Sequence, residues 1–347
     1  MSGGVDSSVA AFLLKKAGHQ VEGVFMKNWE EDEHCPAEKD LKDAEAVCEK
    51  LHIPLQVVNF ADRYWEHVFS ACLQGYRAGL TPNPDILCNK EIKFNAFLNY
   101  AKQRGADSIA TGHYVRSQKN ASGFHLLKGC DPAKDQSYFL YTLNQTQLTH
   151  SLFPVGDLSK QAVRTIAKEI GLPNHAKKDS TGICFIGERK FKPFLNDYLP
   201  TQKGEIKTLE NEVIGSHDGL MFYTIGQRQG LQIGGKKNKQ ELAWYVAEKD
   251  LKQNALIVVQ GNNHPALFKT SITTSFIHWI HHVPSLPCPI KAKTRYRQTD
   301  QSCTIEKAGH LYQIIFEKQQ RAITKGQSIV FYQDDICLGG GIIEDGC

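Results

Sequence analysis

"MSGGVDSSVA", residues 1–10, combines two adjacent glycines with an aspartate and two serines directly before a helical pattern. Backbone N–H groups beside glycines can form a nest for an anion, and the start of a helix adds positive potential. The hydroxyls of Ser2, Ser7 and Ser8 can donate hydrogen bonds to a phosphate. The alternative is a glycine turn followed by a serine-capped helix. These ten residues alone leave both interpretations open.

The segments that follow alternate between helical and strand-like patterns. Strand patterns at 20–26, 53–60 and 107–114 alternate with helical patterns at 7–19, 40–51, 62–79 and 93–105, and helical patterns continue to about Leu199. This alternation is typical of an α/β fold in which a parallel sheet has helices on both faces. Ligands of such sheets bind at the carboxyl ends of the strands. We therefore expect the opening loop, Met26 and Gly112 to lie close together.

The pattern changes at Thr201, where short strand-like runs begin to alternate with turns. This pattern predicts a small β-rich domain and then a β-barrel, with a boundary near residues 261–267. We expect three domains: a catalytic α/β domain at 1–200, a central domain at 201–263 and a C-terminal barrel at 264–347.

Composition limits the class of protein. The 347 residues carry a net charge of only +4 and are 41% hydrophobic, so any nucleic-acid surface must be a local patch. No apolar run approaches the roughly 18 residues of a membrane span, and no secretory leader precedes the loop. We therefore expect a cytoplasmic protein. The ten cysteines include no Cys-x-x-Cys pair, which argues against a zinc or iron–sulfur site, and no dedicated metal site is expected.

Two cysteines lie in chemically suggestive loops. Cys88 follows a proline-rich turn and precedes a helical pattern, where a thiolate is favoured, and Asp85 is close enough to act as an acid or base. Cys184 lies in a Ser-Thr-Gly loop flanked by Lys177, Lys178 and Arg189, cations that would stabilise a thiolate or persulfide. Each cysteine could equally be a small buried residue.

Two further segments could contact RNA. Asp135, Gln136 and Ser137 could bind an RNA backbone or simply cap a turn. The stretch KAKTRYR places four basic residues at alternate positions: Lys291, Lys293, Arg295 and Arg297. In a strand all four would project from one face, and Tyr296 could stack on a base. A solvated strand face is the alternative.

Taken together, these segments resemble the tRNA-specific 2-thiouridylase family, within the PP-loop ATP pyrophosphatases. The similarity rests on eight stretches in the family's order: SGGVDSSVAA, NPDILCNKEIKF, ATGHY, KDQSYFL, KDSTGICFIGER, YTIGQRQGL, KTRYRQ and CLGGGII. The resemblance implies that ATP, with Mg²⁺, adenylates the C2 oxygen of the wobble uridine of tRNA, and that sulfur comes from a cysteine persulfide charged by a sulfur-donor protein.

The resemblance also implies roles for individual residues. Cys184 would carry the persulfide, and Cys88 would be the second catalytic thiol, assisted by Asp85 and closing a transient disulfide with Cys184. ATP would contact Met1, Ser2, Gly3, Gly4, Val5, Asp6, Ser7, Met26 and Gly112. The target base and tRNA would contact Asn83, Pro84, Asp85, His113, Asp135, Gln136, Ser137, Arg295, Tyr296 and Gln327.

Three further expectations complete this interpretation. Members of the family usually have a strand and a glycine before the serine-glycine loop, so we expect the natural protein to be slightly longer. We expect a monomer. The competing functions are another PP-loop ligase that adenylates a small metabolite, and a tRNA-binding homologue with impaired catalysis.

Overall fold

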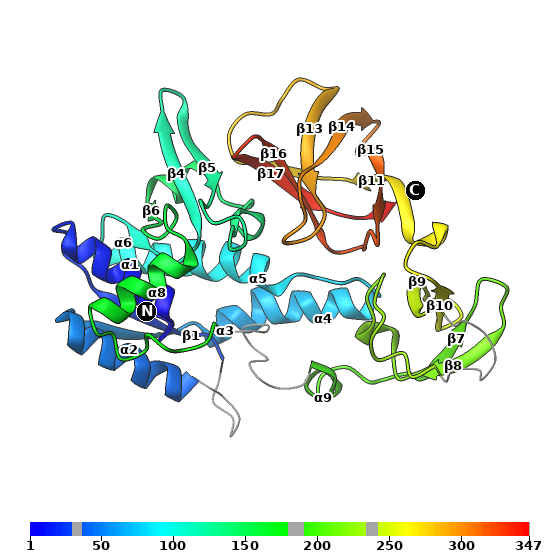
Figure 1. Cartoon of the computed structure of the whole chain (residues 1–347), viewed down its shortest axis with the longest axis horizontal. Coiled ribbons are helices and arrows are strands. Elements are labelled where there is room, and N and C mark those ends of the chain that lie inside the picture. Colours follow the sequence, from blue (N-terminus) through cyan, green and yellow to red (C-terminus); the bar gives the residue numbers. More distant parts are fainter. Residues whose placement is uncertain (30–36, 180–190, 234–241, 347) are drawn as a thin grey trace.

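The computed structural model describes residues 1–29, 37–179, 191–233 and 242–346. The first part is a layered α/β unit (Figure 1). Helix α1 (Val5–Lys16) packs against both helix α8 (Lys160–Glu169) and helix α2 (Ala37–Leu51), and α2 also packs against strand β1 (Gly23–Lys27). Val9 of α1, Val47 of α2 and Val163 of α8 belong to one buried apolar cluster, which fixes these helices together.

The parallel sheet is present as two strand pairs in the described part of the chain. Strand β1 pairs with β2 (Leu55–Asn59), and β3 (Ile109–Ala110) pairs with β6 (Ser151–Leu152), both in parallel. The opening residues connect the two pairs. The amino group of Met1 donates to the carbonyl of Val24 in β1, and the start of α1 lies against Gly112, just after β3. The α/β class predicted from the alternating pattern is thus observed.

A long helical rod leads from β2 toward the β domains. It consists of α3 (Ala61–Tyr64), the π-helical turn η1 (Trp65–Phe69) and α4 (Ser70–Arg77), and it confirms the helix predicted near 62–79. After a reversal, α5 (Pro84–Leu87), the π-helical segment η2 (Cys88–Phe97) and α6 (Leu98–Gln103) run back toward β3. Shorter elements follow: η3 (Ser137–Phe139), α7 (Gln145–Thr149) and α9 (Phe191–Asn196).

One prediction for this part is wrong. Residues expected to continue in helical patterns instead form an antiparallel hairpin of β4 (Val115–Asn120) and β5 (Gly123–Lys128). The turn between the strands contains Ser122 and Gly123, and Gly123 has φ +136°, a conformation that favours glycine. The Asn-x-Ser-Gly turn between alternating residues is a hairpin signal that the helical interpretation overlooked.

The central part forms a four-stranded sheet in the order β8-β7-β10-β9. Its strands are β7 (Gly204–Lys207), β8 (Val213–His217), β9 (Trp244–Asp250) and β10 (Ala255–Gln260), with the short helix η4 (Leu220–Phe222) beside them. Ile206, Val246 and Val258 are fully buried between these elements. This observation agrees with the predicted small β-rich unit.

The C-terminal part is a large antiparallel sheet that follows the short helix η5 (Pro265–Leu267). Its strands are β11 (Phe268–Thr274), β12 (Ile277–Trp279), β13 (Cys288–Lys293), β14 (Gln301–Ala308), β15 (Leu311–Arg321), β16 (Ser328–Gln333), β17 (Ile336–Ile342) and β18 (Asp345–Gly346). Strand β13 ends at Lys293. The prediction that Lys291 to Arg297 share one strand face is therefore wrong, and Arg297 has φ +64°, which strand geometry excludes.

The hairpin β4–β5 belongs to this C-terminal sheet. Strand β5 pairs antiparallel with β17, with Ile336 opposite Leu127 and Cys337 opposite Leu126. The sheet order β18-β11-β15-β14-β13-β16-β17-β5-β4 therefore includes two strands from the first part of the chain. Two segments separated by about two hundred residues of sequence thus share one hydrogen-bonded sheet.

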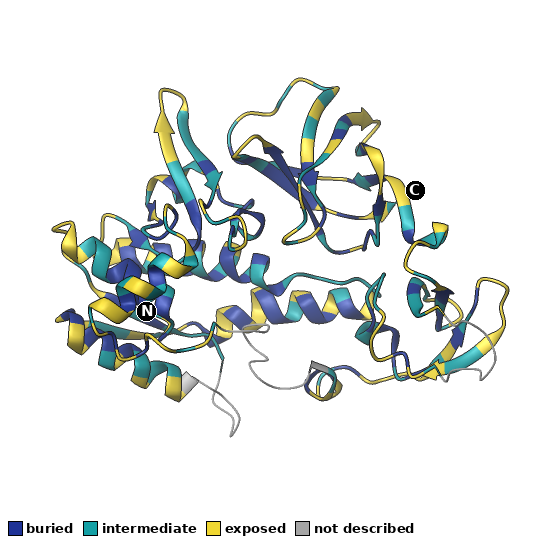
Figure 2. Ribbon diagram, viewed as in Figure 1, coloured by how far each residue is buried: buried dark blue, intermediate teal, exposed yellow. Residues whose placement is uncertain are grey.

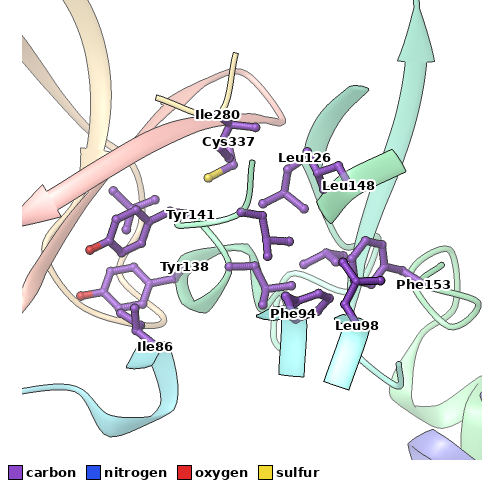
Figure 3. Close-up of a cluster of buried hydrophobic side chains, with 14 of the residues drawn as sticks. Ile86, Phe94, Leu98, Leu126, Tyr138, Tyr141, Leu148, Phe153, Ile280 and Cys337 are labelled. Carbon is purple, nitrogen blue, oxygen red and sulfur yellow. The ribbon is translucent and has the colours of Figure 1, made fainter. Parts of the chain in front are cut away.

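A single buried core lies beneath this joined sheet (Figure 3). Phe94 and Leu98 come from the helices, Leu126 comes from β5, and Ile280 and Cys337 come from the barrel. Strands β16 and β17 are mostly buried, and Figure 2 shows them dark blue where they face the helical part. Because apolar side chains from both parts are buried together, the stability of the first part of the chain depends on that of the C-terminal sheet.

No helix in the described ranges is both long and apolar enough to span a membrane.

We predict that Leu126→Ala destabilises the catalytic part and the barrel together. Leu126 is fully buried in their common core, and deleting a buried leucine side chain lowers the free energy of unfolding by about 2–5 kcal/mol. Leu209→Ala is the control, because Leu209 is 48% exposed in the central part and should change stability by about 0.5 kcal/mol or less. Scanning calorimetry measures both. Two separate transitions, of which Leu126→Ala moves only one, would contradict the shared core.

Candidate active site

The opening loop forms a tight turn into helix α1. Gly4 is the N-cap residue and receives no side-chain cap; instead the Ser7 and Ser8 hydroxyls donate to its carbonyl, at 3.0 and 2.9 Å. Ser2 Oγ lies 3.0 Å from Ser7 Oγ. The serines therefore shape the loop rather than cap the helix, which leaves the first-turn N–H groups of α1 directed out of the helix start. This geometry favours the anion-nest interpretation over the capped helix.

Two glycines permit the close approach of backbones around this loop. Gly3 has φ +69°, and a Cβ placed on it would lie 2.3 Å from the carbonyl oxygen of Asp40. A Cβ on Gly112 would lie 2.7 Å from backbone atoms of Asp6 and Ser7. Neither position has room for a side chain. The predicted contact residues Gly3, Asp6, Ser7 and Gly112 are thus brought together, and Met26 lies at the carboxyl end of β1, as expected.

A buried cation holds Asp6 in place. Lys160 Nζ lies 2.7 and 2.9 Å from the two carboxylate oxygens of Asp6 and 2.7 Å from Asp179 Oδ1, and its side chain is only 11% exposed. Tyr114 also donates to Asp6, at 2.7 Å. An ammonium group at the start of a helix opposes the helix dipole, so Lys160, the first residue of α8, requires such carboxylate partners. That unfavourable placement is the sequence signal that could have revealed Lys160, which the sequence analysis missed.

Asp179 is the second centre of this charge cluster. Its carboxylate accepts from Lys134 at 2.6 Å and from Arg164 at 2.8 Å, in addition to Lys160. Partial burial alone would raise the pKa of Asp179, but the hydrogen bonds and charges of Lys134 and Lys160 outweigh it and lower the pKa to about 2. The cluster therefore places three cations beside the opening loop, with the carboxylates of Asp6 and Asp179 balancing part of their charge.

Cys88 lies at the start of η2, directly after a capped turn of helix. The side-chain oxygen of Asn83 accepts from the backbone N–H groups of Asp85 and Ile86, at 3.1 and 3.3 Å, and Pro84 occupies the first helical position. Cys88 is 2% exposed and belongs to the same packed cluster as Met26 at the end of β1. The carboxyl end of β1 and the Cys88 helix are therefore parts of one packed region.

Asp85 is half-buried and His113 is buried, and this burial shifts both of their pKa values. Burial raises the pKa of Asp85, and the charge of Lys93 opposes this rise. Burial, together with Lys93, lowers the pKa of His113 well below its ordinary value, so the imidazole is neutral at pH 7. The His113 ring lies 5.8 Å from the Phe94 ring, and its Nδ1 is 2.9 Å from Thr111 Oγ1. The charge of Lys93 affects the pKa of both groups, although its position in the sequence does not indicate this.

The second thiol, Cys184, lies outside the described residues, and its proposed disulfide with Cys88 stays a prediction.

Asp135, Gln136 and Ser137 lie inside the contact between the catalytic part and the barrel. Asp135 is 6% exposed and pairs with Lys293 of β13 at 3.4 Å, while Ser137 is fully buried and bonds Tyr332 of β16 at 3.1 Å. Gln136 accepts from the backbone of Tyr114 at 2.9 Å. Each of the three side chains bonds protein groups in this structure, and their predicted contact with tRNA stays a prediction.

The remaining predicted tRNA residues lie on the barrel side of the same contact. Tyr296 packs against Phe139, with ring centroids 4.6 Å apart. Arg295 Nη2 approaches the carbonyl of Arg321 at 3.5 Å, and burial and the Arg321 charge lower the pKa of Arg295. Gln327 donates to the carbonyl of Thr81 at 2.8 Å, two residues before Asn83. The structure thus brings Gln327 close to the turn that begins the Cys88 helix.

Three family models match successive parts of the chain. They are described as the tRNA methyl transferase HUP domain (residues 1–188), the tRNA methyl transferase PRC-barrel domain (192–260) and the aminomethyltransferase beta-barrel domain (269–343). With the glycine loop and the parallel strand pairs, these matches define the class: a PP-loop nucleotide-binding domain followed by two β domains.

Individual relatives define the family. The "tRNA-specific 2-thiouridylase MnmA" of Pseudomonas syringae pv. syringae is 59% identical over 99% of this chain and 93% of that protein, and the protein of the same name from Colwellia psychrerythraea is 57% identical over 99% and 94%. A solved structure, "U34-tRNA thiolase NcsA from Methanococcus maripaludis with its [4Fe-4S] cluster", is 17% identical over 50% of this chain and 55% of that one, with a TM-score of 0.33. The chain belongs to the tRNA-specific 2-thiouridylase family, as its motifs predicted.

We predict that Asp179→Asn weakens the acid dependence of stability. The folded-state pKa of Asp179 lies below the value of about 3.9 in unfolded chains, so its stabilising contribution is present above that value and is lost as pH falls toward 2. The variant should have a lower free energy of unfolding at pH 7 and lose less of it between pH 5 and 2. Urea unfolding across this pH range tests the prediction, with the exposed Asp197→Asn as control. Parallel pH profiles for Asp179→Asn and the unaltered protein would refute it.

Proposed function

We propose that this chain is an ATP-dependent tRNA uridine 2-sulfurtransferase that thiolates the wobble uridine in the cytoplasm. The observation that carries the proposal is the packing of Cys88 in one cluster with Met26 at the end of β1, the strand to which the opening loop is bonded through Met1. The full-length similarity to proteins named tRNA-specific 2-thiouridylase supports it. We also propose the division into domains at 1–200, 201–263 and 264–347.

The opening loop suits a nucleotide phosphate. The start of α1 offers backbone N–H groups, and Lys160, Lys134 and Arg164 supply positive charge nearby. We assign ATP to this loop, to Met26 and to Gly112. Mg²⁺ bound with the nucleotide would neutralise the departing pyrophosphate. Within the described residues, no group of three or more His, Cys, Asp or Glu side chains could hold a metal ion by itself.

The proposed reaction has two stages. In the first, the C2 oxygen of the uridine attacks the α-phosphorus of ATP, and pyrophosphate leaves. In the second, the Cys88 thiolate attacks the inner sulfur of a persulfide on Cys184, which forms the Cys88–Cys184 disulfide and releases the outer sulfur as hydrosulfide. The hydrosulfide adds at C2, AMP leaves with the oxygen, and an external thiol later reduces the disulfide.

One carboxyl group and one neutral imidazole serve this chemistry. Asp85 lies one helical turn before Cys88, and its raised pKa suits a group that takes or gives a proton. His113 is neutral and follows β3, so it can contact an uncharged base without introducing a charge. The base must leave its stack to reach Cys88, as in other enzymes that modify bases.

The partners in this proposal are tRNA and a persulfide-carrying sulfur donor. Arg295, Tyr296 and Gln327 border the barrel side of the contact described above, together with Asn83 and Pro84 at the start of the Cys88 helix. We propose that the tRNA anticodon arm docks there, on a monomer.

We predict that Cys88→Ser and Cys184→Ala each abolish 2-thiouridine formation while tRNA affinity changes less than about twofold, since the thiols serve chemistry rather than backbone contacts. Cys130→Ser is the control, because Cys130 is exposed and outside the cluster of Cys88. Mass analysis of nucleosides from tRNA incubated with ATP and a persulfide donor measures the product. Full activity of either thiol variant would exclude the two-thiol reaction.

We predict that Arg295→Ala weakens tRNA binding and reduces its salt dependence, with a slope change of about one if Arg295 contacts a phosphate. Binding titrations at several salt concentrations provide the slope. Arg104→Ala is the control, because Arg104 is an exposed arginine at the end of α6, away from the barrel. A slope equal to that of the unaltered protein would remove Arg295 from the interface.

A further inference from the structure

The chain reverses direction immediately before the Cys88 helix. Helix α4 ends at Arg77 with Ala78 as its C-cap, and the next residue, Gly79, has φ +73°. The Leu80 N–H donates to the Gly75 carbonyl at 2.9 Å, as in helices that end with a glycine after the C-cap. Pro82 packs back on Gly75, since a Cβ there would lie 3.2 Å from Pro82 Cγ. Asn83 then caps α5. The position of Cys88 is therefore set by residues 79–83.

The central domain contacts this reversal at Gly79. Lys249 of β9 donates to the carbonyl of Gly79 at 3.1 Å. The Leu251 side chain covers the same glycine so closely that a Cβ on Gly79 would lie 2.5 Å from Leu251 Cδ2. An ammonium group at the carboxyl end of a helix is favoured by the helix dipole. Burial lowers the pKa of Lys249 to about 8, which agrees with an ammonium group largely shielded from water.

The barrel contacts the same reversal at Thr81. The Thr81 N–H donates to the Lys325 carbonyl at 2.9 Å, and Gln327 Nε2 donates to the Thr81 carbonyl at 2.8 Å, so both backbone groups of Thr81 are bonded to one barrel loop. Gly326 between them has φ +88°, and a Cβ on it would lie 2.8 Å from Leu80 Cβ and from Thr81 N. The two backbones are therefore in direct contact.

The same barrel loop, residues 321–327, also contacts the central domain and Arg295. The Arg321 guanidinium lies over the Tyr245 ring at 5.1 Å, and its carbonyl is approached by Arg295. A Cβ on Gly226 would lie 2.6 Å from Ala322 Cβ. One loop thus touches the central domain, the reversal before Cys88 and a residue assigned to tRNA.

We propose that residues 79–83 form a three-way junction that positions the Cys88 helix, with Lys249 and Gln327 as its positioning residues. Binding of tRNA to the barrel would order loop 321–327 and, through Thr81, the start of the Cys88 helix. The positioning of the Cys88 helix rests on the contacts alone, whereas its coupling to tRNA binding rests on the proposed function.

The test of positioning measures alkylation of Cys88 by iodoacetamide in the full chain without RNA, followed by peptide mass spectrometry. Cys88 is 2% exposed, so its reaction reports how often the helix opens. Lys249→Met and Gln327→Met should each accelerate it about three- to tenfold, the factor that the loss of one hydrogen bond allows. The exposed Cys130 should react unchanged. Lys249→Arg, which keeps a donor, should restore the slow rate.

The matched controls are Lys252→Met and Gln333→Met, exposed residues of the same two domains, which should leave the rate unchanged. Equal Cys88 rates in all variants would overturn the positioning role. In thiolation assays Lys249→Met should lower kcat and leave KM for tRNA nearly constant, whereas lost substrate binding would raise KM.

A measurement on the unaltered protein covers the case in which a variant fails to fold. Hydrogen exchange of residues 79–88 should slow when an anticodon stem–loop RNA binds. Bound RNA with unchanged exchange in this segment would overturn the coupling to tRNA. RNA that does not bind would instead refute the proposed function, and the alkylation rates would still decide the positioning role.

Discussion

The pairing of β5 with β17 is the constraint on which the rest of the molecule depends. It joins a hairpin of the nucleotide-binding part to the C-terminal sheet and closes a common apolar core over Phe94, Leu126 and Cys337. Polar groups also bond across the contact: Ser137 bonds Tyr332, and Tyr138 donates to the Ser328 carbonyl at 2.8 Å. Buried hydrogen bonds of this kind fix one orientation of the two parts, because breaking them would leave polar groups without partners.

Because this orientation is fixed, the central sheet and the barrel can both contact the segment that leads to Cys88. The helix of Cys88 contributes Ile86 and Phe94 to the common core, while the reversal before it is bonded to the central sheet through Gly79 and to the barrel through Thr81. A substrate that docks on the β domains would therefore meet a thiol whose position those domains already determine. Preorganisation of this kind lowers the entropic cost of bringing reacting groups together.

The charged side chains at the opening loop are also paired with one another. Lys160 is almost buried and lies between Asp6 and Asp179, so each charge has an opposite neighbour before any nucleotide is present. An unpaired ammonium in this position would carry a large desolvation cost. A bound phosphate could exchange places with one of the carboxylates without leaving the cation unpaired.

The sequence by itself determined the α/β class, the long helix near 62–79, the β-rich second half and the family, because these follow from local periodicity and from motifs whose residues are adjacent in the chain. It also selected the opening loop, Met26 and Gly112 as neighbours, since strand ends of one parallel sheet meet at one edge. Only the tertiary structure decided that residues 115–128 form a hairpin, that β13 ends before Arg295, and that Asp135 and Ser137 are buried. It also decided that Lys160 pairs with Asp6 and that Lys249 bonds the carbonyl of Gly79. These outcomes depend on partners up to about two hundred residues away, and no local pattern records which distant strand, carboxylate or carbonyl a side chain will meet.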